Sequence, residues 1–193
     1  MKTILNNNMN EIIIKNSKFI TLLYKINNVN DVDNILNKVK FEYKDATHYC
    51  YSYIIDNIYK SSDDGEPGGT AGMPILGVLK NNDLNYVLAI VVRYFGGIKL
   101  GAGGLVRAYT KSVTETLKNS KIVTLNDGYN LIIEFDYDRL KEIDYILRDS
   151  IINNKIFDNK IKYDIDITKD TYNKLVNNKD FKILKETDKK IPY

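Results

Sequence analysis

The 193-residue sequence predicts an α+β fold in two domains, and three observations carry that prediction. Segments that alternate apolar and polar residues, as strands do, are interspersed with segments of helical period. From Tyr129 onward these segments follow the order strand, helix, strand, strand, helix, strand, which is the split βαβ arrangement. Ten of the eleven glycines lie between Gly65 and Gly104, so unusual backbone conformations are concentrated in one stretch of the first domain.

The first domain opens with strands. Residues 11–26 are rich in β-branched and aromatic side chains and predict either two strands broken near Asn16-Ser17 or one bulged strand. A helix follows, because Val32, Ile35, Leu36 and Val39 recur at helical spacing. Residues 46–56 alternate strictly and predict a strand with an aromatic face.

The middle of the chain holds most of the glycines. Residues 61–72 predict a loop, and Pro74 suits the first turn of a helix because its missing N–H would be unpaired there. Residues 84–95 are almost wholly apolar, as in a central strand covered on both faces. A glycine-rich loop then leads into a helix over 105–119.

Asn126-Asp127-Gly128 is a turn signal and marks the expected boundary between domains 1–125 and 128–193. The second domain is expected to contain a strand over 129–137, a helix from Asp138, one or two strands within 154–168, a helix over 169–179 and a strand over 181–186. The polar tail 187–193 is expected to fray.

Composition limits the class of protein. No run approaches the roughly 18 apolar residues of a membrane span, and the start of the chain lacks the apolar core of a signal peptide. The single cysteine excludes an internal disulfide, so we expect a cytoplasmic protein. The net charge of +3 is too small to indicate nucleic acid by itself. However, residues 84–114 contain no acidic residue, although they include Arg93, Lys99, Arg107 and Lys111.

A phosphate site is one interpretation of this basic stretch. Gly101-Ala102-Gly103-Gly104 precedes a predicted helix whose first N–H groups are free to bind an oxyanion. Lys99 and Arg107 flank the glycines. The dinucleotide and P-loop motifs are both absent. The alternative is a tight turn that packs the helix closely against the sheet.

Aromatic residues add a second interpretation. Tyr94 and Tyr109 lie within the basic stretch and could stack on bases beside Arg93. Tyrosines of this kind also occur in cores and cross-strand pairs.

Three carboxylates stand close together at Asp63, Asp64 and Glu66. They could bind Mg²⁺ or serve as general acids and bases. They could equally cap a helix and shape a turn. His48 is the only histidine and shares a strand face with Cys50, which suggests a nucleophile or part of a metal site that would also need the loop carboxylates. The alternative is a buried, partnered histidine, which we favour because side chains two residues apart on a strand are too distant for a direct hydrogen bond.

Four segments in order, 17–19, 45–53, 62–76 and 91–110, resemble the IMPACT family, whose bacterial members are YigZ-like proteins. Two positions depart from the usual family pattern, Tyr49 after the histidine and Gly68 before Gly-Thr-Ala.

The resemblance implies a first domain similar to domain 2 of ribosomal protein S5. It also implies a ferredoxin-like second domain similar to the last domain of translocating elongation factors. Both folds recur in translation proteins that touch RNA. Eukaryotic relatives act in translational control by binding a partner protein, and they carry a further partner-binding domain. The S5-like fold also hosts kinases with a glycine-rich phosphate loop.

Together these observations predict a translation-associated regulatory protein that binds RNA or a ribosomal partner, and binding is favoured over catalysis. The expected RNA or phosphate contacts are Arg93, Tyr94, Lys99, Gly101, Gly103, Gly104 and Arg107. One alternative is an enzyme acting on a phosphorylated small molecule, with Asp63, Asp64 and Glu66 holding Mg²⁺. Another is a protein-interaction module. We find no sign of sequence-specific DNA binding or of a membrane span, and the sequence leaves the ligand and oligomeric state open.

Overall fold

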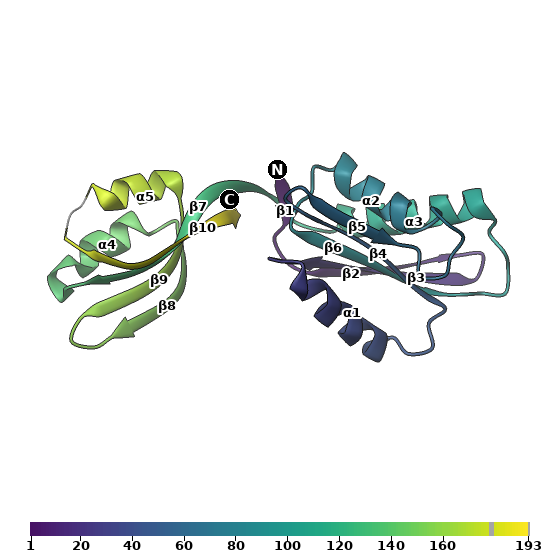
Figure 1. Cartoon of the computed structure of the whole chain (residues 1–193), viewed down its shortest axis with the longest axis horizontal. Helices are drawn as coiled ribbons and strands as arrows, with labels where there is room; N and C mark the ends of the chain where they lie inside the picture. Colours follow the sequence, from purple (N-terminus) through teal and green to yellow (C-terminus); the bar gives the residue numbers. More distant parts are fainter. Residues whose placement is uncertain (178–179, 193) are drawn as a thin grey trace. The chain divides into compact units, whose positions relative to one another are not determined.

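A computed structural model describes residues 1–177 and 180–192 of the protein. The chain divides into two compact units, Met1–Thr124 and Leu125–Tyr193. Each unit combines a β-sheet with helices (Figure 1), which confirms the predicted α+β fold. Within the described residues, no helix is both long and apolar enough to cross a membrane.

The sheet of the first unit has five strands, and all neighbouring pairs are antiparallel. Their order is β2 (Asn8–Ile14), β3 (Ser17–Lys25), β6 (Val87–Tyr94), β4 (His48–Ile55) and β5 (Ile58–Ser62). Lys15 and Asn16 join β2 to β3 at positive φ, as a two-residue hairpin requires. The predicted break near Asn16-Ser17 is therefore confirmed. In contrast, β5 occupies the start of the predicted loop, which shortens that loop to residues 63–71.

Helices cover both faces of this sheet (Figure 1). The helices are α1 (Asn30–Glu42) on one face and α2 (Gly72–Asn81) and α3 (Ala102–Lys118) on the other. Because side chains alternate along a strand, Phe19 packs toward α2 and α3 while its neighbour Ile20 packs toward α1. The sheet is consequently buried on both sides, which explains why β6 is apolar almost throughout.

Helix α3 begins earlier than the sequence predicted. Gly101 is its N-cap residue at φ 73°, and Gly103 and Gly104 lie in the first turn rather than in a loop. Position 101 favours glycine because other residues rarely adopt positive φ. The helix therefore begins directly after Gly101.

The predicted turn at Asn126–Gly128 is wrong. These residues lie inside one long strand, β7 (Ile122–Phe135), whose first residues pair with β1 (Lys2–Ile4). The glycine is needed for a different reason: a Cβ at position 128 would lie 2.1 Å from the carbonyl oxygen of Ile167 in the adjacent strand. Gly128 thus allows close approach of a neighbouring strand.

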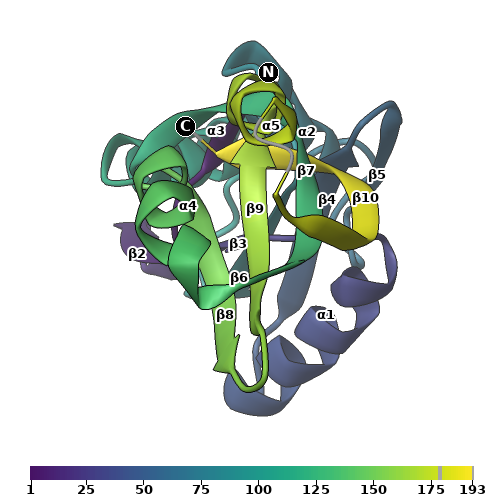
Figure 2. The same ribbon diagram turned by 90° about the vertical axis from the view of Figure 1, so that its left-hand side faces the viewer.

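The second unit has the ferredoxin-like order of strands β10-β7-β9-β8, all antiparallel. Its further elements are η1 (Tyr137–Arg139), α4 (Leu140–Ile146), β8 (Ile151–Phe157), β9 (Ile161–Thr168), α5 (Lys169–Val176) and β10 (Lys182–Pro192). Each helix connects two strands that flank a third, which is the split βαβ arrangement. Figure 2 shows α4 and α5 on one side of the four strands.

The tail does not fray as predicted. Residues 187–192 belong to β10 and pair with residues 125–130 of β7. Ile191 is buried, and Lys189 and Lys190 pair with Asp166 and Asp127. The helix predicted over 169–179 ends at Val176, and its last two predicted positions, Asn178 and Lys179, lie outside the described residues.

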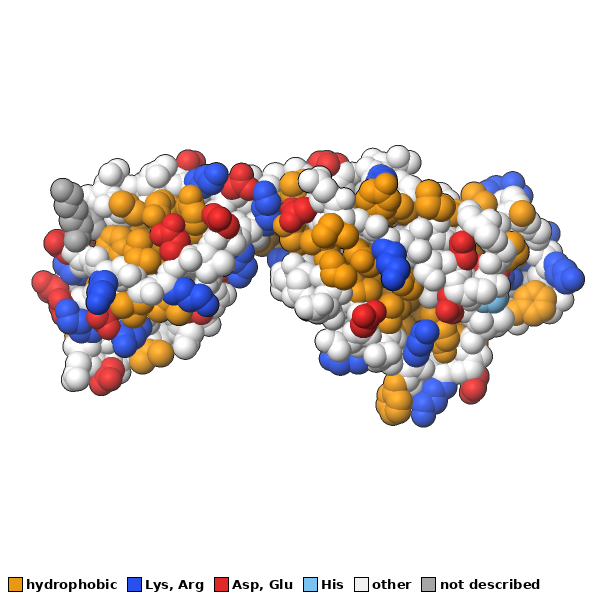
Figure 3. All heavy atoms as spheres, viewed as in Figure 1, with side chains coloured by type: hydrophobic (Ala, Val, Ile, Leu, Met, Phe, Trp, Pro, Cys, Tyr) orange, Lys and Arg blue, Asp and Glu red, His pale blue; other side chains and the backbone are white. Residues whose placement is uncertain are grey.

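Acidic and basic side chains are interspersed on the face drawn in Figure 3. This mixture matches the small net charge of +3. Any attraction of an anion must therefore come from a local arrangement of groups, which has to be sought in particular clefts.

Two glycine substitutions test whether position 128 requires glycine because a neighbouring strand approaches closely. Gly128→Ala should destabilise the second unit by about 2 kcal/mol or more, because the added methyl group meets backbone that cannot move aside. Gly77→Ala, in the interior of α2 with nothing within 4 Å of the new Cβ, should stabilise the first unit by about 0.5–1 kcal/mol. Urea unfolding of both variants measures the two changes. Equal effects would contradict this explanation.

Candidate functional site

The acidic loop and the basic stretch meet through a buried ion pair. Arg93 lies on the central strand β6, and its Nη1 donates to Glu66 Oε1 at 2.5 Å. The two side chains are 5% and 3% exposed, so the pair is shielded from water. The Tyr109 hydroxyl donates to the same carboxylate oxygen at 2.7 Å, and Arg93 Nη2 donates to Ser17 Oγ at 3.3 Å. Four segments distant in sequence are thereby joined.

Arg93, which we predicted as an RNA or phosphate contact, is thus 5% exposed and bonded within the protein. Its guanidinium lies 5.4 Å from the ring centroid of Phe19 and 5.6 Å from that of Phe95. Its Nε is buried without a hydrogen-bond partner within the described parts of the chain. Arg93 therefore positions Glu66 and Phe95 and keeps one donor unused.

Asp63 shapes the loop that carries Glu66. One carboxylate oxygen accepts the N–H groups of Ala71 and Gly72 at 2.9 and 2.8 Å, and the other accepts that of Gly69 at 2.8 Å. Burial alone would raise the pKa of Asp63, but these three hydrogen bonds outweigh it and hold the pKa below the ordinary value of 3.8. Asp63 thus satisfies the start of α2, as the capping interpretation proposed.

Asp64 orients the histidine. Its carboxylate accepts the Tyr49 N–H at 2.7 Å, and its carbonyl oxygen lies 2.8 Å from His48 Nδ1. A carbonyl can only accept, so Nδ1 carries the proton. The other ring nitrogen, Nε2, lies 3.8 Å from Glu66 Oε2.

The three neighbouring carboxylates therefore serve three separate purposes. Asp63 binds backbone, Asp64 binds β4, and Glu66 binds Arg93 and Tyr109. Within residues 1–177 and 180–192, no group of three or more His, Cys, Asp or Glu side chains is placed to hold a metal ion. The arrangement does not fit the Mg²⁺ site that the sequence suggested.

Cys50 does not form a nucleophile pair with His48. Its sulfur lies 2.9 Å from the Asp63 carbonyl oxygen and 3.3 Å from the Tyr109 hydroxyl. Burial, opposed in part by the Tyr109 hydrogen bond, raises the pKa of the thiol to about 12. Since the thiolate is the nucleophile, Cys50 is inert at neutral pH.

A cleft of about 430 Å³ opens beside the ion pair. Its lining combines both predicted motifs and consists of Thr47, His48, Glu66, Pro67, Arg93, Phe95, Lys99, Leu100, Gly101, Ala102 and Leu105. The acidic loop and the glycine loop therefore form one site. The first N–H groups of a helix have no intrahelical partner, and no side chain caps those of α3. The start of α3 therefore has N–H groups available at this cleft.

The other predicted contacts lie outside the lining. Tyr94 faces the opposite side of the sheet, where it packs near α1 and its hydroxyl donates to the Lys44 carbonyl. Arg107 is exposed on α3, and its Nη1 would lie 3.6 Å from a Cβ placed on Gly103. Gly104 closes the first turn of α3 near Leu100. Sequence reasoning missed Thr47 and Phe95, although both flank predicted motifs directly.

Comparison with known proteins identifies the family. The sequence profile of the Impact N-terminal domain matches residues 15–117, which include every residue that lines the cleft. The chain belongs to the IMPACT family. The curated IMPACT family member YvyE of Bacillus subtilis is 45% identical over 143 residues, covering 72% of this chain and 66% of that protein. For YigZ of Escherichia coli the identity is 36% over 139 residues, covering 69% and 68%.

Other IMPACT-family relatives match over a shorter part. The Haemophilus influenzae family member is 44% identical over 110 residues, so this chain spans about half of its length. A crystal structure described as a hypothetical protein has a TM-score of 0.62 at 29% identity and covers 95% of both chains. The two-domain translational regulator Yih1 gives a TM-score of only 0.36 at 19% identity, which is too low a likeness to support an argument.

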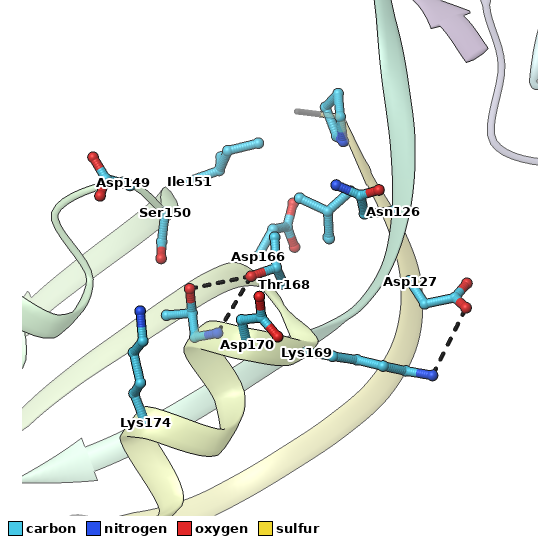
Figure 4. A pocket seen from close by; sticks show the side chains of 13 residues that line it. Asn126, Asp127, Asp149, Ser150, Ile151, Asp166, Thr168, Lys169, Asp170 and Lys174 are labelled. Atoms are coloured by element: carbon cyan, nitrogen blue, oxygen red, sulfur yellow. Dashed lines mark hydrogen bonds and ion pairs between the residues drawn. The ribbon is translucent and has the colours of Figure 1, made fainter. Parts of the chain in front are cut away.

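A second hollow of about 520 Å³ lies in the second unit, at the start of α5 (Figure 4). Its lining includes Asp149, Asp166, Asp170 and Lys174. Charged groups here are largely paired with each other: Lys169 pairs with Asp127, and Asp166 with Lys189. None of the residues predicted as functional lies in this hollow.

The buried ion pair can be tested by a double-mutant cycle. Arg93→Met should destabilise the first unit by about 3 kcal/mol, because Glu66 is left buried without its counter-charge. Adding Glu66→Gln should recover part of that loss, since the unpaired charge is removed. Urea unfolding gives the free energies. Arg107→Met, at an exposed arginine, is the control and should change stability by less than about 0.5 kcal/mol. An equal loss of unfolding free energy in Arg93→Met and Arg107→Met would contradict the assignment of Arg93 to a buried ion pair.

The role of Asp63 predicts a pH dependence. The pKa of Asp63 is lower in the folded protein than in the unfolded chain. Its contribution to the free energy of unfolding is therefore fully present at pH values above the unfolded pKa, and it is lost as the pH falls through the folded pKa. Asp63→Asn should therefore cost about 1–2 kcal/mol at pH 7, and the difference from wild type should shrink toward about pH 2. Urea unfolding at several pH values measures this. Asp188→Asn, at an exposed aspartate of β10, should show no such trend. A constant difference across pH would argue against the three hydrogen bonds.

Proposed function

We propose that this IMPACT-family chain is a cytoplasmic, translation-associated protein that binds RNA, and that one nucleotide of the RNA lies in the cleft between residues 66–67 and 95–105. The observation that carries the proposal is the combination of an exposed aromatic ring, a lysine and an uncapped helix start in one cavity of about 430 Å³.

Phe95 supplies a surface on which a base can stack. The residue is 46% exposed, its backbone N–H donates to Thr47 Oγ1 at 3.0 Å, and the Arg93 guanidinium lies 5.6 Å from the ring centroid. Stacking of a base on such a ring is worth about 1–3 kcal/mol and tolerates any sequence. A half-exposed ring at the edge of the cleft therefore offers a face to a base.

The start of α3 supplies a place for phosphate. The free N–H groups of the first turn and the partial positive charge of the helix attract an oxyanion, and Lys99 adds a full positive charge. Glu66 does not oppose this attraction, since Arg93 cancels its charge.

The link to translation rests on the fold expected for the family. Domains similar to domain 2 of ribosomal protein S5 and to the last domain of translocating elongation factors occur in proteins that touch RNA. The partner is therefore RNA or a ribosome-associated assembly. A magnesium-dependent reaction on a phosphorylated molecule has less support, because Asp63, Asp64 and Glu66 do not converge.

The proposal is tested by fluorescence anisotropy with a labelled single-stranded RNA of about 12 nucleotides. Phe95→Ala should weaken binding about 10-fold through the loss of stacking. Lys99→Ala should also reduce the slope of log affinity against log salt by about 0.7, as expected for one lost phosphate contact on a single strand.

Matched controls lie elsewhere in the same unit. Phe41 is 75% exposed on α1, and Lys111 is exposed on α3 outside the cleft. Phe41→Ala and Lys111→Ala should leave affinity and salt slope unchanged. Binding that ignores salt, or that falls equally in all four variants, would contradict the proposal. Capture of a protein partner that survives RNase treatment and requires the cleft residues would favour an interaction module instead.

A further inference from the structure

Two hydrogen-bond acceptors face each other in the wall of the cleft. His48 Nε2 and Glu66 Oε2 are 3.8 Å apart, and both residues line the cavity. The first comes from the start of β4 and the second from the loop before α2. Neither phosphate binding nor base stacking uses them, so they call for a separate explanation.

The hydrogen bond from His48 Nδ1 to Asp64 leaves Nε2 as the ring nitrogen available to a ligand. The Nδ1–H donates to the carbonyl oxygen of Asp64 at 2.8 Å, and Asp64 is itself held by the Tyr49 N–H. In the neutral ring only one nitrogen carries hydrogen, so Nε2 presents a lone pair. The imidazole is 18% exposed, which leaves that nitrogen within reach of a ligand in the cleft.

Glu66 is also oriented by its partners. Its Oε1 accepts hydrogen bonds from Arg93 and Tyr109, whereas the interaction described for Oε2 is the 3.8 Å contact with His48. Because the guanidinium neutralises the carboxylate, the pair attracts a neutral donor more than a second cation. Two acceptors cannot bond to each other, so a ligand hydroxyl can donate its single hydrogen to either of them, and a diol can supply one hydrogen to each.

We propose that His48 Nε2 or Glu66 Oε2 accepts a hydrogen bond from a ribose hydroxyl, or each accepts one from a ribose diol, and that this makes the cleft selective for RNA over DNA. This inference rests on the proposed RNA binding and adds that the protein recognises a hydroxyl group of the sugar. The three parts of a nucleotide then have three places in one cavity: the base at Phe95, the phosphate at Lys99 and the start of α3, and the sugar at His48 and Glu66. The 2′-hydroxyl is the group that distinguishes the two nucleic acids.

The same chemistry is offered by an internal 2′-hydroxyl and by the 2′,3′-diol of a terminal nucleotide. Four oligonucleotides of one sequence containing only adenine and cytosine separate the possibilities: all RNA, all DNA, DNA with a single 3′-terminal ribonucleotide, and RNA with a 3′-terminal deoxyribonucleotide. Because the bases are identical, any difference in anisotropy-measured affinity comes from the sugar.

Wild-type protein should bind RNA about 10-fold more tightly than DNA, since DNA lacks the hydroxyl that makes this hydrogen bond. If the terminal diol is read, one 3′-terminal ribonucleotide should restore the affinity of DNA. If an internal hydroxyl is read, RNA with a deoxy end should bind like RNA. Equal binding of RNA and DNA by the wild-type protein overturns the inference but leaves RNA binding intact, whereas failure to bind either overturns both proposals.

Variants identify the residues responsible. His48→Ala should lower RNA affinity to the level of DNA and leave DNA affinity unchanged. Phe95→Ala should weaken both equally and keep their ratio, because stacking does not depend on the sugar. Tyr94→Phe, on the opposite face of the sheet, should change neither.

A second variant covers the risk of misfolding. Glu66→Gln keeps the shape of the side chain and should also reduce the ratio of RNA to DNA affinity; thermal unfolding of both variants shows whether the fold persists. If folded His48→Ala and Glu66→Gln proteins keep the wild-type ratio, or lose RNA and DNA affinity in equal proportion, the two residues do not read the sugar.

Discussion

The ion pair between Arg93 and Glu66 is the interaction on which the first unit depends. It joins the central strand to an otherwise irregular loop, and its further hydrogen bonds reach Ser17 and Tyr109. A buried ion pair is seldom more stabilising than a well-packed apolar pair of equal volume. What it contributes here is position. The carboxylate is held beside His48 and the guanidinium beside Phe95, so one contact sets both walls of the cleft.

Because the site depends on this ion pair, its position in the chain could be predicted from the sequence, but the contacts between its residues could not. The glycines, the carboxylates and the acid-free stretch all pointed to residues 62–110, and the cleft is built mainly from them. However, the pairing of Arg93 with Glu66 depends on how α2, β4 and β6 pack together, which no local pattern encodes. Phe95 was missed because a single aromatic residue after a strand has no periodicity. The misplacement of Tyr94 was avoidable, since neighbours on a strand face opposite sides and Arg93 could not share a cleft with it.

The fold was predicted where periodicity was strong. Alternation marked β4 and β9, and helical spacing marked α1 and α3. The failures occurred where one residue type serves two purposes. Gly128 was interpreted as a turn residue, but it permits two strands to approach closely. The lysines after residue 187 were interpreted as a solvated tail, but they pair with aspartates of neighbouring strands. Such ambiguities are resolved only by tertiary contacts, because glycine and lysine suit both roles equally well.

The pairing of β10 with β7 has a consequence for how the protein emerges from the ribosome. Residues 182–192 complete a sheet whose partner strand lies at residues 125–134. The first unit can form its full set of strand pairings once residue 124 has left the exit tunnel. The second unit must instead hold an unpaired strand edge until β10 appears. Synthesis therefore imposes an order of folding on the two units, and the already folded first unit is present while the second is still exposed.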